Sequence, residues 1–267
     1  MKKITVFICL LMTICLHTQA QCKAKNTAFQ GGEVLNYRLF FNWKFVWVSA
    51  GTAKMTTQSS TDGGFKSHLI THSSKKIDKF FMMRDTLLSI MDKDLVPQYY
   101  RKAANEGGKY YVDQVWYNYQ DGHTHLKQEY LNRNGEIKKK TYESNACIYD
   151  MMSMMQRARS FDASNYKVGE KIQFPMADGD EVEQVTLIYR GKKDFKMEDS
   201  RTKYHCLVFS FVEYEKNKEN EIITFYITDD KNHLPVRLDL FLKFGTAKAF
   251  LCSAEGVRNP QTSIASE

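Results

Sequence analysis

The sequence lacks the short motifs that mark the common enzyme families. It contains no G-x-S-x-G, no H-E-x-x-H, no phosphate-binding loop, no dinucleotide-binding glycine pattern and no C-x-x-C. Catalytic groups can also be assembled in space from distant residues, so the missing motifs leave catalysis without support and do not exclude it. We therefore name no catalytic residues and expect no cofactor.

Long apolar runs are also scarce, because no segment after residue 20 is long and apolar enough to form a membrane-spanning helix. The first twenty residues begin with two lysines within three positions, continue with an apolar stretch over 4–16 and end at a cleavage-like Ala20. This pattern is typical of a secretory signal peptide. Cys22 follows Gln21 and not the small residue that a lipoprotein signal needs, so we expect no lipid anchor. The chain is expected to be periplasmic or secreted.

Charge is modest. The formal net charge is +7, and it falls to +5 when the two lysines of the signal peptide are removed. Short lysine clusters at 75–76, 138–140 and 192–193 are expected to be solvated loop ends. No nucleic-acid-binding motif is present, so we expect no nucleic-acid partner.

Cysteine is sparse, since four cysteines follow the signal peptide: Cys22, Cys147, Cys206 and Cys252. An exported chain can form disulfides, and four cysteines allow three complete pairings that the sequence does not distinguish. Cys206 and Cys252 both fall on predicted strands. A disulfide between them and a pair of free, buried cysteines are both open.

Alternating apolar residues dominate the first part of the chain. Every odd position from Leu35 to Trp47 is apolar, and most even positions are polar. A period of two predicts one long strand, or two strands joined by a bend near Asn42, with one face buried.

The stretch 222–244 shows the same pattern around a turn. Residues 222–228 are mainly β-branched or aromatic, residues 229–235 favour a turn, and apolar residues alternate over 236–244. Pro235 has no backbone donor and suits the first residue of a strand. We predict two strands joined by a tight corner.

This corner has an earlier counterpart. Asp-Lys-x-x-x-Pro spans 92–97 and recurs over 230–235, an offset of 138 residues. A Gly-Glu pair at 32–33 recurs at 169–170, and His68 has a counterpart at His205, both at an offset of 137. We therefore infer an internal duplication of a β unit. The two proposed copies span 28–119 and 165–257, joined by a hairpin and a helix over 120–164.

One helix is predicted over 145–159, between the two copies. Its apolar side chains follow helical spacing, with Asp150 early and arginines late, as the helix dipole favours. The apolar stripe consists of Ile148, Met151, Met152 and Met155.

About a dozen short strands and one helix favour an all-β, mainly antiparallel fold. We expect a barrel or strongly curved half-barrel that the helix covers. After a signal peptide over 1–20, residues 21–267 are expected to form a single β-rich domain.

Methionine and tryptophan supply the candidate ligand site. A methionine-rich helix against an aromatic sheet can line an adaptable apolar pocket, although the same side chains can simply fill a core. The candidate ligand-binding residues are Met151, Met152, Met155, Trp43, Trp47 and Trp116. His123 and His125 have a spacing compatible with two metal ligands, but no third ligand is evident nearby, so we predict no metal site.

Several of these features resemble a bacterial family known as domain of unknown function 3108. They are Gly32-Glu33 before an aromatic strand and Gly51, the helix with Asp150, Arg157 and Arg159, and Phe225-Tyr226-Ile227 leading to Pro235. The resemblance covers roughly residues 29–256. It implies an exported envelope protein of a Gram-negative bacterium, and it brings no established activity.

The leading hypothesis is a non-catalytic envelope protein that binds an apolar or lipid-like ligand beneath the methionine-rich helix. The alternative is a structural or protein-interaction module whose apolar side chains fill its core. An enzyme would require a concave cluster of perturbed carboxylates or histidines.

Overall fold

The computed structural model describes residues 22–43, 46–197, 202–216, 218–242 and 245–265. The predicted signal peptide lies outside the described residues. Among the described residues, no helix has the length and apolar character that crossing a membrane requires. The helical elements within these ranges are α2 (Lys75–Asp78), α3 (Met151–Ala158) and a 3-10 turn, η1 (Ala163–Asn165).

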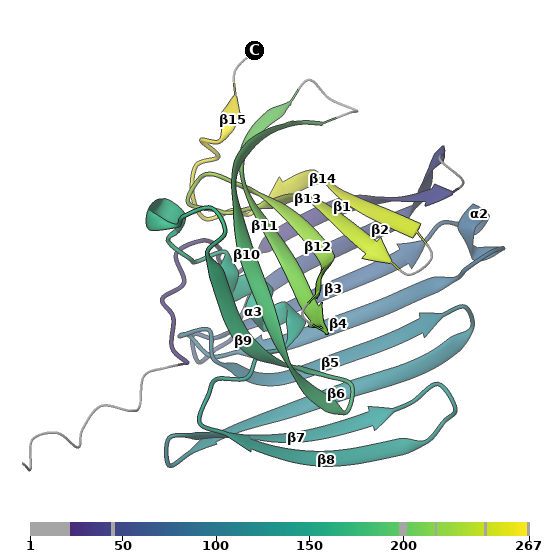
Figure 1. The fold of residues 1–267 in the computed structure, drawn as a ribbon, viewed down its shortest axis with the longest axis vertical. Coiled ribbons are helices and arrows are strands. Elements are labelled where there is room, and N and C mark those ends of the chain that lie inside the picture. Colours follow the sequence, from purple (N-terminus) through teal and green to yellow (C-terminus); the bar gives the residue numbers. More distant parts are fainter. Residues whose placement is uncertain (1–21, 44–45, 198–201, 217, 243–244, 266–267) are drawn as a thin grey trace, which may run out of the picture.

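Antiparallel strands make up most of the fold (Figure 1). In chain order they are β1 (Glu33–Trp43), β2 (Val46–Ser59), β3 (Phe65–Ser73), β4 (Met83–Met91), β5 (Pro97–Glu106), β6 (Lys109–Gln120), β7 (His123–Leu131), β8 (Ile137–Ser144), β9 (Lys171–Asp178), β10 (Glu181–Lys196), β11 (Lys203–Glu215), β12 (Lys218–Thr228), β13 (Pro235–Leu242), β14 (Gly245–Glu255) and β15 (Ile264–Ala265).

All of these strands belong to one sheet, in which β1 pairs with β14. The order is β8-β7-β6-β5-β4-β3-β2-β1-β14-β13-β12-β11-β10-β9, and the short β15 pairs with β11. We call β2 to β8 the first arm and β13 to β9 the second arm. The outermost strands, β8 and β9, do not pair with each other in the described part of the chain, so the sheet is curved but not closed. The prediction of an antiparallel half-barrel is confirmed.

The two arms meet at the turn between β9 and β10. Gln128 Nε2, on β7, donates to the carbonyl oxygens of Gly179 and Glu181 at 3.3 and 3.1 Å. The N–H of Gly179 donates to Asp113 Oδ2, on β6, at 3.0 Å. The second arm therefore curls over the inner face of the first, and α3 lies between them against β4 and β9 (Figure 1).

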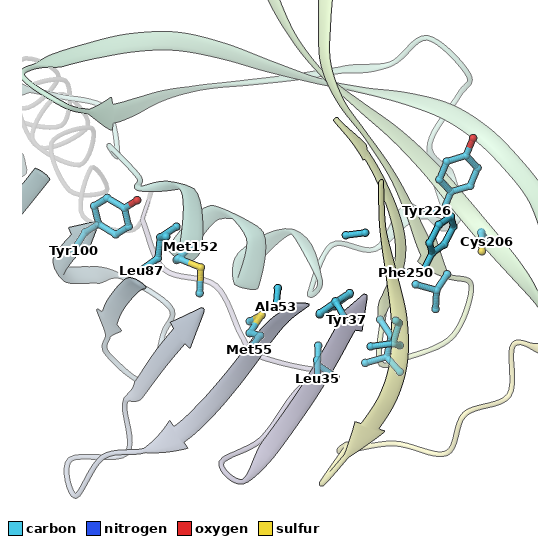
Figure 2. Close-up of a cluster of buried hydrophobic side chains, with 14 of the residues drawn as sticks. Leu35, Tyr37, Ala53, Met55, Leu87, Tyr100, Met152, Cys206, Tyr226 and Phe250 are labelled. Carbon is cyan, nitrogen blue, oxygen red and sulfur yellow. The ribbon is translucent and has the colours of Figure 1, made fainter. Parts of the chain in front are cut away.

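Apolar side chains from both arms and from α3 form one core (Figure 2). Along β1 and β4 its members alternate with more exposed residues, as a period of two requires, whereas the middle of β11 is buried on both faces. Representative members are Leu35, Tyr37, Met55, Leu87, Tyr100, Met152, Cys206, Tyr226 and Phe250. The interior of the curl is thus packed with side chains.

The predicted helix is confirmed but starts later than position 145. Tyr149 forms an isolated parallel bridge with Met176 of β9, so the chain before α3 is extended. Asp150 is the N-cap, and its carboxylate accepts from the N–H of Ser153 at 2.8 Å. Apolar periodicity runs through Ile148, but the capping residue decides where helical hydrogen bonds begin. The one-turn α2 was not predicted, because it is too short to show periodicity.

The alternating run that starts at Leu35 is two strands, β1 and β2, which was one of the two alternatives. The connection between them, residues 44–45, lies outside the described residues. Leu35 and Tyr37 are buried, whereas Trp47 is 39% exposed. The burial of one face of these strands therefore decreases toward the end of the sheet where Trp47 lies.

The two proline corners have the same backbone geometry. In each, the aspartate side chain accepts the N–H two residues on, at 2.8 and 3.0 Å, and its carbonyl accepts the N–H three residues on, at 3.1 Å in both. That third residue is left-handed, with φ of 58° and 44°. The matching residues are Asp92 and Asp230, Asp94 and Asn232, Leu95 and His233, and Pro97 and Pro235. Each proline begins a strand.

The proposed duplication stays a prediction, although each proposed copy contains six consecutive strands, β1 to β6 and β9 to β14. One of its sequence matches was wrong. His68 pairs with Leu88, four residues before the corner aspartate, whereas the carbonyl of His205 accepts from Asp229, directly before the corner aspartate. The two histidines are therefore not equivalent positions.

A disulfide joins Cys22 to Cys147, across 125 residues. It fixes the start of the described chain to the segment before α3. Cys206 is a free, buried cysteine and Cys252 is a free, exposed one. The cross-strand pairing that the sequence left open does not form.

Candidate functional site

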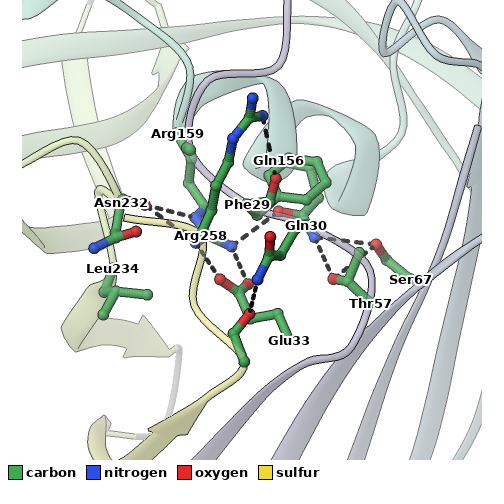
Figure 3. Close-up of polar contacts among 12 residues, drawn as sticks. Phe29, Gln30, Glu33, Thr57, Ser67, Gln156, Arg159, Asn232, Leu234 and Arg258 are labelled. Atoms are coloured by element: carbon green, nitrogen blue, oxygen red, sulfur yellow. Dashed lines mark hydrogen bonds and ion pairs between the residues drawn. The ribbon is translucent and has the colours of Figure 1, made fainter. Parts of the chain in front are cut away.

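A buried ion pair lies at the end of α3, between the start of β1 and the second proline corner (Figure 3). Arg159, the C-cap of α3, donates to both carboxylate oxygens of Glu33 on β1, at 2.6 and 2.9 Å. The two side chains are 2% and 1% exposed. Arg159 also donates to the carbonyl of Asn232, in the second proline corner, at 3.2 and 3.1 Å. One guanidinium thus connects α3, β1 and the second arm.

Neighbouring polar side chains extend this network. Gln156 Oε1 accepts from Arg159 at 3.2 Å, and Gln156 Nε2 donates to Thr57 and Ser67 at 2.9 and 3.0 Å. The guanidinium also lies 5.4 Å from the ring of Phe29. A buried charge needs such partners, because burial without them is very unfavourable. The arrangement leaves Arg159 and Glu33 engaged with each other and with protein groups, which favours a structural role.

A second buried carboxylate lies at the other end of α3. Burial raises the pKa of Asp150 to about 6, and hydrogen bonds from Ser153 and Ser89 oppose that rise. Tyr117 donates to Asp150 Oδ2 at 3.5 Å, and burial raises the pKa of this tyrosine well above its usual range. The carboxylate satisfies the first turn of the helix and attaches it to the first arm.

Two further carboxylates lie on the inner face of the first arm. Burial raises the pKa of Asp113 to about 7, the N–H of Gly179 opposes the rise, and the charge of Asp178 adds to it. Burial and the charge of Glu106 raise the pKa of Asp85 to about 6. The Oδ1 atoms of Asp85 and Asp113 have no hydrogen-bond partner among the described residues. These groups can exchange protons near neutral pH, and the positive charge of Lys102 beside both carboxylates opposes part of the rise in their pKa values.

The structure separates the candidate ligand residues. Met152 is 1% exposed and belongs to the core, Met155 is half-buried against it, and Met151 is 40% exposed. Trp116 neighbours Tyr117 along β6, so its side chain points away from the face that contacts α3. Because Trp116 lies on the outer face, it does not share an interior pocket with Met152.

The other two tryptophans lie at one end of the sheet. Trp47 is near the start of β2, and Lys248 Nζ lies 4.1 Å from its ring centroid. Trp43 is the last residue of β1, and its side chain lies outside the described part of the structure. The six residues therefore do not form one site.

His123 and His125, at the start of β7, both lie near one glutamate. Glu143 lies 3.0 Å from His123 Nδ1 and 3.8 Å from His125 Nδ1. Within the ranges that the structure describes, no group of three or more His, Cys, Asp or Glu side chains has an arrangement that could hold a metal ion.

Two of the surface grooves that the described residues form lie near residues discussed above. One, of about 470 Å³, lies over β6, β7 and β8 and is lined by Trp116, His125, Lys127, Tyr142 and Glu143 among others. The other, of about 660 Å³, lies beside the second proline corner. Its lining carries both signs of charge: Lys25, Lys192, Lys231 and Arg258 with Asp162, Asp229 and Asp230. Lys192 is paired with Asp229 at 2.6 Å, which leaves the second groove without a clear preference for anions.

The buried network was not predicted from the sequence. Glu33 entered the sequence analysis as part of a repeated Gly-Glu pair and Arg159 as a late arginine of the helix, and the two residues are 126 positions apart. When a single charged residue lies beside an apolar strand or helix, the sequence does not indicate which oppositely charged residue pairs with it. A polar residue within a strongly apolar segment, such as Gln156 after Met154 and Met155, is the one hint that the chain offers.

Comparison with known proteins supports the fold and the family. No curated protein matches the chain. Among solved structures, a β-barrel-like protein of the DUF1849 domain from Brucella abortus matches with a TM-score of 0.55 and 11% identity, covering 87% of this chain and 100% of that one. At that identity the match supports the fold alone.

A second match is a protein from Bacteroides fragilis that is described as a candidate exported protein with a YmcC-like fold. Its TM-score is 0.27, with 8% identity over 88% of this chain and 100% of that one, and at that score it carries no argument. The family model described as "Protein of unknown function (DUF3108)" matches residues 36–251. The chain therefore belongs to the DUF3108 family.

Proposed function

We propose that this protein is an exported, non-catalytic envelope protein that works through contacts on its outer surface, as an interaction module with a filled core. The observation that supports this proposal best is the packing of α3 between the arms. Met152 and Tyr100 are each 1% exposed and Leu35 is fully buried. A pocket for a drug-sized ligand has a volume of about 300–1,000 Å³, and the apolar interior here is occupied by the protein's own side chains.

The interior polar groups support the same proposal. The donors of Arg159 engage Glu33, Gln156 and a backbone carbonyl, so they are not directed toward an open space. A binding site normally presents a few convergent polar groups to its ligand. Here those groups hold the arms and α3 together.

A second candidate function is binding of an apolar or lipid-like ligand beneath α3. It is favoured by the outer edge of β8, which pairs with no further strand among the described residues, and by the partial exposure of Met151 and Met155 on the helix. Such a ligand would have to displace α3 from the core. That movement would break the hydrogen bonds between Arg159 and Glu33.

Native mass spectrometry of the purified mature chain distinguishes the two functions. A filled core predicts the mass of the polypeptide alone, before and after extraction with organic solvent. It also predicts that Met152→Ala, which opens a cavity, increases binding of an apolar fluorescent probe, whereas Met151→Ala at an exposed position of the same helix does not. Recovery of a lipid in one-to-one ratio from the wild-type chain would overturn the first proposal in favour of the second.

A further inference from the structure

Large apolar side chains are exposed along one end of the sheet. Val46 is 62% exposed, Trp47 39%, Phe80 77%, Phe81 41%, Phe241 42% and Leu242 40%. We call these six residues the apolar rim. Single exposed apolar residues are ordinary, but a concentration of them marks an interaction surface.

The topology brings the apolar rim together. Val46 and Trp47 begin β2, Phe80 and Phe81 lie between α2 and β4, and Phe241 and Leu242 end β13. Because β4, β3, β2, β1, β14 and β13 are consecutive antiparallel neighbours, these three connections project from the same end of the sheet (Figure 1). The N–H of Ser74, just before α2, donates to the carbonyl of Ala50 on β2 at 2.8 Å, which holds the connection with Phe80 against β2.

Lysines accompany the apolar rim. Lys75, Lys76 and Lys79 precede Phe80 and Phe81 in the sequence Lys-Lys-Ile-Asp-Lys-Phe-Phe, and all three lysines are exposed. The intervening Asp78 has its charge offset by Arg84, at 2.6 Å. Lys248 adds a cation beside Trp47, on the other side of the rim. The rim therefore combines aromatic rings with an excess of positive charge.

This combination matches a lipid surface that carries negative charge. Aromatic side chains favour the boundary between lipid headgroups and acyl chains, and lysines near an anionic surface are attracted to it. A protein partner would need a surface that is complementary in shape to these side chains. A fluid membrane has no fixed shape, so it can accept aromatic rings that project from separate loops.

We infer that the apolar rim docks on an anionic membrane surface, with Phe80 and Phe81 entering the headgroup region and Lys75, Lys76 and Lys79 facing the headgroups. The inference rests on the proposed function, in which the outer surface and not the interior does the binding. The inference adds to the proposed function that the partner is an anionic lipid surface.

Vesicle co-sedimentation of the mature chain tests the inference. The probes are vesicles of phosphatidylglycerol with phosphatidylethanolamine, and vesicles of phosphatidylcholine alone. We expect wild-type protein to partition onto the anionic vesicles, and partition to fall at least about tenfold for Phe80→Asp/Phe81→Asp, because two rings no longer leave water. The matched control is Val168→Asp, which changes a 72% exposed residue just before β9, at the opposite end of the sheet.

A second variant tests the charge. Lys75→Glu/Lys76→Glu/Lys79→Glu should lose at least about tenfold in binding to anionic vesicles and little to phosphatidylcholine, and added salt should weaken wild-type binding. Equal binding by wild type and Phe80→Asp/Phe81→Asp, or no binding of the wild type, would overturn the inference. So would a dimer of the wild type in light scattering that the same variant abolishes, since the rim would then contact a second copy. Circular dichroism confirms that each variant is folded. The vesicle results are independent of the lipid-extraction result, which tests the filled core.

Discussion

Removal of one partner of the buried ion pair should destabilise the protein more than any exposed charge substitution. Arg159→Met leaves the Glu33 carboxylate, 1% exposed, without its cation, and it removes two donors to the carbonyl of Asn232. Breaking a buried pair in this way costs about 3–5 kcal/mol. That is a large part of the roughly 5–15 kcal/mol that holds a domain folded. Glu33→Gln should cost a similar amount, because it leaves the guanidinium charge buried.

Urea unfolding followed by circular dichroism measures the free energy of unfolding of each variant. The double variant Glu33→Leu/Arg159→Met should lose at least about 2 kcal/mol less than the sum of the single losses, because no unpaired charge is left. The matched control is Lys139→Met, whose pairing with Glu129 is exposed and should contribute less than about 1 kcal/mol. A loss below about 1 kcal/mol for Arg159→Met would refute the conclusion that this arginine holds α3 to β1 and to the second arm.

Three further predictions concern the disulfide, the buried carboxylates and the edge strand. Cys22→Ser/Cys147→Ser should lose up to about 5 kcal/mol of unfolding free energy, since the disulfide closes a loop of 125 residues in the unfolded chain; an unchanged urea midpoint would contradict this. Burial raises the pKa of Asp113 to about 7, so its contribution to stability is complete below pH 4 and is lost as pH rises through 7. Asp113→Asn should therefore reduce the fall in stability between pH 4 and 8, by at most about 1.4 kcal/mol per pH unit, and an identical pH profile would count against the raised pKa. Lys138→Thr/Lys140→Thr removes charges from the edge strand β8 and should increase aggregation in light scattering, whereas a variant that stays monomeric would show that other features protect this edge.

Local patterns of the sequence predict the strands well. Alternating burial and turn residues are properties of a few neighbouring positions, and they are enough to locate the run from Leu35 and the corner at Pro235. The start of α3 is less predictable, because Ile148 fits the helical periodicity although it precedes the helix. The parallel bridge between the next residue, Tyr149, and Met176 of the distant strand β9 keeps this segment extended.

The candidate site is less predictable than the fold, because burial depends on the whole sheet. Met152 and Trp116 both look suited to an apolar pocket, yet strand alternation puts Trp116 on the outer face. Likewise, the sequence gives no reason to pair Arg159 with Glu33 and not with another carboxylate. Exposure of Phe80 and Phe81 also follows from topology, since an apolar pair after a lysine cluster can equally belong to a core.

The contacts between the edges of the two arms show why the interior network matters for stability. Where the arms approach at their edges, Lys138 and Lys140 of β8 pair with Asp180 of the β9–β10 turn at 3.4 and 3.2 Å, and both lysines are at least half exposed. Exposed pairs contribute little, about 0–1 kcal/mol each. The arms are therefore held chiefly by the core, by the hydrogen bonds of the buried Gln128 and Asp113 to this turn, and by Arg159, which contacts β1 and the second corner at once. A ligand that entered beneath α3 would have to break the contacts of Arg159, which are the strongest of these. A partner at the apolar rim would break none of them. Binding at the surface therefore costs less free energy than binding beneath α3, which favours a function at the surface.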